Sequence, residues 1–129
     1  MTTPTPLPPP VDDEVLEMLA SLQEPGEPDL LTELVTLFLR DTPVRLRDLE
    51  VRPLEPSATA RVAHAVKGSA GNLGATHLQD LASTLEQAGR QGIAADALAT
   101  MADALCAEYD RVAAYLSSVI AGRADGRTE

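Results

Sequence analysis

Apolar residues recur at intervals of three and four through most of this 129-residue chain, which is the spacing of one face of an α-helix. No segment shows the alternating pattern of a half-buried β-strand. Only three residues are aromatic, so the 44% apolar content comes mainly from Leu, Ala and Val, which favour helices packed at close range. The pattern therefore predicts an all-α protein, and the chain is long enough to form one core.

Proline and glycine divide this pattern into one short and four longer helical segments. The expected helices run from Asp12 to about Leu22, Asp29 to about Arg52, Ser57 to Gly74, Thr76 to about Ala88, and Ala97 to near Gly122. Such segments, joined by short loops, predict an up-down-up-down four-helix bundle with an additional short N-terminal helix. We expect residues 1–10, half of them proline, to form a flexible tail, residues 11–122 the bundle, and residues 123–129 a frayed C-terminal tail.

The charge and cysteine content exclude several classes of function. A net charge of −10 argues against nucleic-acid binding, which needs a basic surface, and disfavours anionic membranes. No apolar run approaches the roughly 20 residues of a membrane helix, and no secretory signal is recognisable. The single cysteine excludes an intrachain disulfide and, with two histidines, leaves no metal cluster to assemble. We therefore expect a cytoplasmic, metal-free, monomeric protein.

The only lysine of the chain, Lys67, follows His64 by three residues, so the two side chains are neighbours on a helix. With His64 set at zero, rotation by about 100° per residue places Lys67 near −60°, Gly68 near +40° and Gly71 near −20°. The opposite side, expected to be the core face, carries Val62, Val66, Ser69 and Leu73. His64 is therefore predicted to point away from the core, beside a lysine and two glycines.

The lysine and glycines around His64 suggest a histidine that carries phosphate. A neutral imidazole is a nucleophile, and a lysine ammonium is a mobile point charge suited to a phosphoryl group. Each glycine costs up to about 1 kcal/mol relative to alanine inside a helix. Gly68 and Gly71, beside Ala60, would keep the surface flat for the active site of another protein. The alternative is an inert surface histidine, which is how we interpret His77.

The run His64-Ala-Val-Lys67-Gly68-Ser69-Ala-Gly-Asn72-Leu-Gly74 resembles the signature of the histidine-containing phosphotransfer (HPt) domain of two-component phosphorelays. The segment Leu85-Glu86-Gln-Ala-Gly89-Arg90 resembles the part that follows on the next helix, and the likeness extends from about Asp29 to Gly122. It implies a four-helix bundle with an extra N-terminal helix and phosphorylation of His64. Lys67 would then steady the phosphoryl charge, and Gly68 would give the partner room.

The resemblance also implies the partners, which are receiver domains that supply an aspartyl phosphate and Mg²⁺. The chain itself would hold no cofactor and would act as a phosphocarrier, not an enzyme. One position departs from the pattern. Where some relatives carry an amide facing the histidine, this chain has Glu86, with Gln87 beside it, so the residue that orients the imidazole stays unassigned.

Two features bear on docking and on rival functions. Arg61, Gln87 and Arg90 are expected to rim the contact with a partner. On the second helix, apolar residues recur every seven positions, at Leu30, Leu37, Val44 and Val51. Either they contact the receiver or, as we prefer, the N-terminal helix covers them.

A histidine-kinase fragment is excluded because no ATP-binding domain fits in this length. An acidic helical adaptor that docks a receiver or other protein without phosphotransfer remains the alternative.

Overall fold

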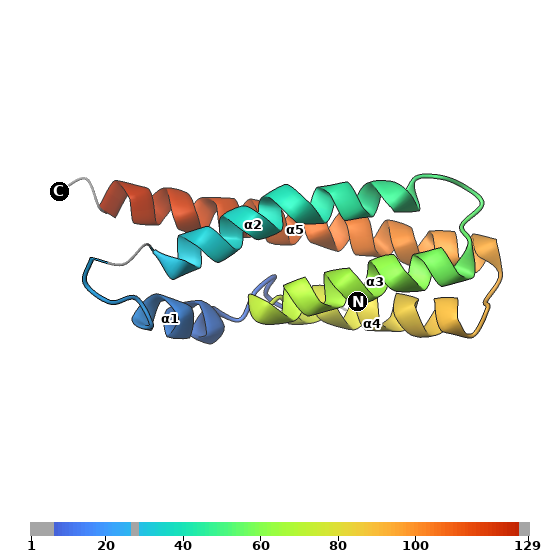
Figure 1. Ribbon diagram of the computed structural model, residues 1–129, viewed down its shortest axis with the longest axis horizontal. Coiled ribbons are helices and arrows are strands. Elements are labelled where there is room, and N and C mark those ends of the chain that lie inside the picture. Colours follow the sequence, from blue (N-terminus) through green and yellow to red (C-terminus); the bar gives the residue numbers. More distant parts are fainter. Residues whose placement is uncertain (1–6, 27–28, 127–129) are drawn as a thin grey trace, which may run out of the picture.

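The computed structural model describes residues 7–26 and 29–126, and in this part of the chain all regular structure is helical (Figure 1). The helices are α1 (Asp13–Ser21), α2 (Leu30–Leu46), the 3-10 helix η1 (Arg47–Leu49), α3 (Pro56–Asn72), α4 (Thr76–Arg90) and α5 (Ala95–Gly126). The predicted all-α class is therefore confirmed. No helix in these residues is long and apolar enough to cross a membrane.

The long helices α2 to α5 lie side by side, and consecutive helices run in alternating directions (Figure 1). Their inner faces meet in one core, in which leucine, valine and alanine dominate. The central members include Val35, Phe38, Val66, Leu78, Leu85, Leu98, Leu105, Val112 and Leu116. Because small residues line the inner face of α3, this helix approaches α4 closely, and the pair forms the most extensive contact in the molecule.

Gly89 sets the distance between α3 and α4 near the start of α3. A β-carbon at this position would lie 2.7 Å from the carbonyl oxygen of Pro56 and 3.0 Å from the β-carbon of Ala60. Both atoms belong to the start of α3, where backbone cannot move aside as a flexible side chain can. The absence of a side chain at Gly89 is therefore a packing requirement.

We expect Gly89→Ala to lower the free energy of unfolding by about 1–3 kcal/mol, because the added methyl group overpacks the α3–α4 contact. Gly122→Ala is the matched control, since a β-carbon at Gly122 meets nothing within 4 Å. That change should stabilise α5 by up to about 1 kcal/mol. Urea unfolding of both variants measures the difference, and equal stability of the two would contradict a close approach at Gly89.

The short helix α1 lies in line with the α3–α4 pair and beside the N-terminal part of α2 (Figure 1). Asp12 caps it, and the Asp12 amide donates a 2.8 Å hydrogen bond to the carbonyl of Gly74, the left-handed residue that ends α3. The hydroxyl of Tyr115 donates to Asp13, and Arg111 donates to the carbonyl of Pro8 at 2.6 Å. These bonds fix the segment from Pro8 to α1 against the bundle. The expected tail falls partly in residues 1–6, outside the described residues.

Two helix ends differ from the prediction. The second helix ends at Leu46 and tightens into the 3-10 turn η1, so the expected continuation to Arg52 is wrong. Helical backbone angles are disfavoured for a residue that precedes proline, and Arg52 precedes Pro53, so the helix is not expected to include Arg52. The expected end of the last helix near Gly122 is also wrong, because α5 continues to Gly126. Arg123 pairs there with the buried carboxylate of Asp29, at 2.9 Å.

Candidate phosphotransfer site

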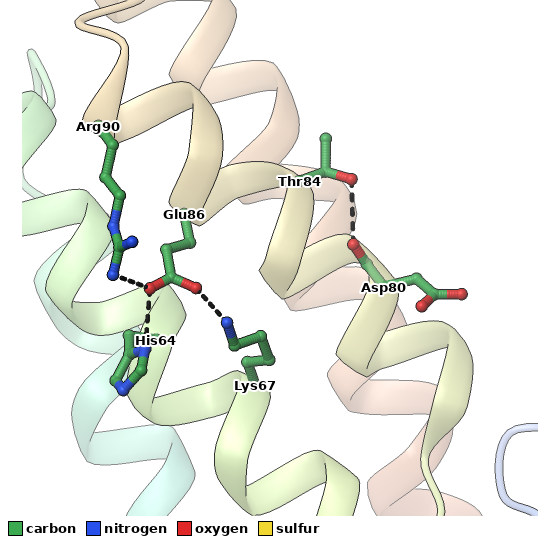
Figure 2. Close-up of polar contacts among 6 residues, drawn as sticks. All are labelled: His64, Lys67, Asp80, Thr84, Glu86 and Arg90. Carbon is green, nitrogen blue, oxygen red and sulfur yellow. Dashed lines mark hydrogen bonds and ion pairs between the residues drawn. The ribbon is translucent and has the colours of Figure 1, made fainter.

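His64 lies in the middle of α3, and its side chain is 66% exposed. The placement predicted from helix rotation, away from the core, is therefore confirmed. The imidazole leans toward α4, where its Nδ1 atom lies 2.8 Å from Oε2 of Glu86 (Figure 2). The ring thus has one nitrogen held by the protein and one directed away from Glu86.

Glu86 is the centre of the site, although its side chain is only 1% exposed. Its Oε1 atom accepts a 2.5 Å hydrogen bond from the ammonium of Lys67, and Oε2 accepts one of 2.6 Å from Arg90 in addition to the contact with His64 (Figure 2). The hydrogen bond from Lys67, with further contributions from His64 and Arg90, lowers the pKa of Glu86 in spite of burial. The carboxylate is therefore ionised at neutral pH.

An ionised carboxylate only accepts hydrogen bonds, and this fixes the tautomer of the neutral imidazole. The proton must lie on Nδ1 of His64, where it is donated to Glu86. The Nε2 atom then carries the lone pair and is the nucleophilic nitrogen. Glu86 is thus the orienting residue that the sequence left unassigned.

The two glycines next to His64 have different surroundings. A β-carbon on Gly68 would meet nothing within 4 Å, so this residue leaves open space beside the imidazole. Gly71 instead faces α4, where a β-carbon would lie 2.8 Å from Nε2 of Gln79. Its expected place on the exposed face is therefore wrong. Ala60 is also buried, at 8% exposure, because it packs against Gly89.

The inner face of α3 is also rotated from the one expected. Its buried residues are Thr59, Ala60, Ala63, Val66 and Ala70, whereas Val62 and Ser69 are only half-buried. The expected core face of α3 contained no alanine, yet Ala60, Ala63 and Ala70 are the side chains that allow α4 to approach. The rotation turns Gly71 and Lys67 toward α4 and leaves His64 at the edge of the α3–α4 contact.

Positive charge gathers around the imidazole although the chain as a whole is acidic. Arg61, His64 and Arg90, together with Ala60, line a shallow open depression beside the ring. Arg61, Arg90 and Gln87 are all exposed, and Arg90 reaches across to Glu86 from one turn further along α4. The surface beside the imidazole is therefore suited to an anion.

The apolar strip on α2 is largely uncovered. Leu37, Val44 and Val51 are exposed, whereas Leu30 packs against the core. The preferred expectation, that the N-terminal helix covers the strip, is wrong for these three residues because α1 lies beside the N-terminal part of α2 (Figure 1). Arg45 lines grooves on this side of the molecule with both Leu37 and Val51.

The comparisons with known proteins agree with this geometry. A family model described as the Hpt domain matches residues 33–115, which is more than half of the chain. The chain therefore belongs to the Hpt domain family, whose members carry phosphoryl groups on histidine in phosphorelays and interact with receiver domains.

One solved structure is similar over most of its length. It is the crystal structure of histidine-containing phosphotransfer protein B (HptB) from Pseudomonas aeruginosa PAO1, with a TM-score of 0.72 and 29% sequence identity. The similarity covers 85% of this chain and 93% of that chain. Among curated proteins, none matches the sequence significantly.

Proposed function

We propose that His64 accepts a phosphoryl group on Nε2 from the aspartyl phosphate of a receiver domain, or from a kinase relay, and passes it to another receiver. The observation that carries this proposal is the exposed imidazole of an Hpt-family chain, with Nδ1 bonded to a buried carboxylate and two cations beside it. The protein is then a phosphocarrier with no catalysis of its own, and it requires no cofactor on this chain.

The transfer step follows from the tautomer. The lone pair of Nε2 attacks the phosphorus of the aspartyl phosphate, and an N–P bond forms as the P–O bond breaks. The electron pair of the P–O bond leaves on the receiver carboxylate, where Mg²⁺ of the receiver would offset its charge. The proton on Nδ1 stays in its hydrogen bond to Glu86. In the opposite direction a receiver carboxylate attacks phosphorus and forms a P–O bond as the N–P bond breaks. The electron pair of the N–P bond returns to Nε2, so the ring leaves as neutral imidazole without any proton having moved.

Phosphoryl transfer also requires that the negative charge of the phosphoryl group be compensated, and the surrounding cations can do this. A phosphoryl group adds roughly −1.5 to −2 charges at neutral pH. Lys67 and Arg90 lie within one turn of His64 or of its partner Glu86, and Arg61 lines the adjoining depression. These side chains position the equatorial oxygens and offset their charge, which is most of what phosphoryl transfer asks of a protein.

The docking face extends in our proposal from His64 across α3 to α2. Gly68 leaves space for the receiver, and Arg61 lines both the depression beside His64 and the groove that contains Val51 and Arg45. The exposed strip of Leu37, Val44 and Val51 continues this surface. An apolar strip flanked by arginines fits a partner whose active site is acidic, as that of a receiver must be to hold Mg²⁺.

The finer properties of the chain are part of the same proposal. We propose an up-down-up-down arrangement of α2 to α5, a monomer, and a cytoplasmic protein that reaches its receivers by diffusion. The alternating helix directions in Figure 1 support the first of these.

Transfer to the isotope-labelled protein tests the function. After incubation with a phosphorylated receiver, chosen by profiling the receivers of the source genome, we expect one phosphoryl group per chain, with ³¹P–¹⁵N coupling to Nε2 of His64. If the protein binds receivers but takes up phosphate from none of them, the result would favour the adaptor. Coupling to Nδ1 would contradict the tautomer that Glu86 imposes.

A further inference from the structure

Both carboxylate oxygens of Glu86 accept hydrogen bonds in the unphosphorylated protein. One oxygen accepts from Lys67, and the other accepts from Arg90 and His64. One negative charge therefore binds two cations, of which Lys67 lies one turn from His64 on α3 and Arg90 lines the depression beside His64. An anion on Nε2 must share these cations with Glu86 or take them from it.

We propose that Glu86 acts as an internal competitor of the phosphoryl group, holding Lys67 and Arg90 until His64 is phosphorylated and taking them back when the group leaves. This inference rests on the proposed function of His64. The buried carboxylate would then both orient the ring and limit how strongly the protein retains phosphate. Competition for the cations depends on the negative charge of Glu86, whereas orientation of the ring requires only a hydrogen-bond acceptor.

The geometry allows Arg90 to move between the two anions. Its side chain is exposed, and its bond to Glu86 is at the end of a flexible side chain that also lines the open depression beside His64. Lys67 is half-buried and bonds to Glu86 through the terminal ammonium. A phosphoryl dianion attracts these cations more strongly than a single carboxylate does, so we expect Arg90, the more exposed of the two, to transfer first.

Glu86→Gln separates charge from orientation, because the amide oxygen still accepts a hydrogen bond from Nδ1 of His64. The amide cannot form an ion pair, so Lys67 and Arg90 become available to the phosphoryl group from the start. We expect the equilibrium constant for phosphorylation to rise about three- to tenfold, the size of a partly screened ion-pair effect. The half-life of phosphohistidine should lengthen in parallel.

Phosphoramidate is a suitable donor because it needs no receiver. Its N–P bond breaks and ammonia leaves, while Nε2 of His64 forms the new N–P bond. ³¹P NMR at fixed ammonia and phosphoramidate concentrations gives the phosphorylated fraction of each variant. Asp80→Asn is the matched control, since it removes the same charge from α4 at an exposed position away from Glu86 (Figure 2). Equal equilibrium constants for all three proteins would overturn the proposal.

NMR of the wild-type side chains provides a second readout that does not depend on a variant folding. On phosphorylation, the Nε–Hε signal of Arg90 should shift while the Nδ1–H signal of His64 persists. An unmoved Arg90 signal would also overturn the proposal.

A double-mutant cycle provides the third readout. Arg90→Gln should weaken phosphorylation more in the Glu86→Gln background than in wild type, because there Arg90 has no other partner. If wild type takes up phosphate from a receiver but shows none of these effects, the competitor role fails and the phosphotransfer function stands.

Discussion

Replacing His64 with glutamine is expected to abolish uptake of acid-labile, base-stable phosphate from a phosphorylated receiver. An amide nitrogen has no available lone pair, so the nucleophile is lost outright. The fold should survive, because the glutamine NH₂ group can still donate to Oε2 of Glu86 and the side chain replaces one that is two-thirds exposed. Radiolabel transfer followed by acid and base treatment measures the loss, and the melting temperature checks the fold.

His77→Gln is the internal control for this result. His77 is the only other histidine and lies at the start of α4, where it lines a pocket with Pro8 and Asp12 of the N-terminal segment. It is remote from Glu86 and half-buried, so its loss should leave phosphate uptake unchanged. Label retained by the His64→Gln protein and lost from the His77→Gln protein would reverse the assignment of the site.

The exposure of His64 could be predicted because it depends on one helix alone. Rotation of 100° per residue fixes which side chains share a face, and the leucines and valines of the other helices show that a core exists. The order of the helices followed from the same periodicity together with proline and glycine. These are local properties, and the structure agrees with them apart from the ends of α2 and α5 and the rotation of the inner face of α3.

The family resemblance placed Glu86 where some relatives carry an amide facing the histidine, but its role could not be assigned because it depends on how two helices pack. It lies 22 residues from His64, and by spacing alone it forms only an ordinary pair with Arg90, four residues further along the helix. Its burial requires α3 to approach α4 closely, which in turn depends on Ala60 and Gly89 being small. The same approach explains why Gly71 lies against the side chain of Gln79.

The position of α1 was unpredictable for a related reason. A short amphipathic helix must cover some apolar surface, but its periodicity does not say which. The hydrogen bond from Asp12 to Gly74 draws α1 to the far end of α3, and the strip of Leu37, Val44 and Val51 is left exposed. Contacts between distant segments therefore decide which apolar face stays available for docking.

Gly68→Gln should weaken receiver binding about tenfold or more, which corresponds to at least about 1.4 kcal/mol. Gly68 lies one turn beyond His64 on the exposed face, and a side chain there would stand where the receiver must approach Nε2. The fold should be unharmed, because a β-carbon at Gly68 meets nothing within 4 Å and glutamine favours a helix more than glycine does. Titration calorimetry with the cognate receiver measures the affinity.

Gly122→Gln tests whether the effect belongs to the docking face. This glycine is also exposed within a helix and also has open space around it, so the substitution brings the same helical gain far from His64. Receiver affinity should match that of wild type, while both variants melt at or above the wild-type temperature. Unimpaired binding by Gly68→Gln would mean that the receiver does not approach across this part of α3. The contact between the receiver and the α2 strip would then have to pass through Arg61, which lines both the depression beside His64 and the groove that contains Val51.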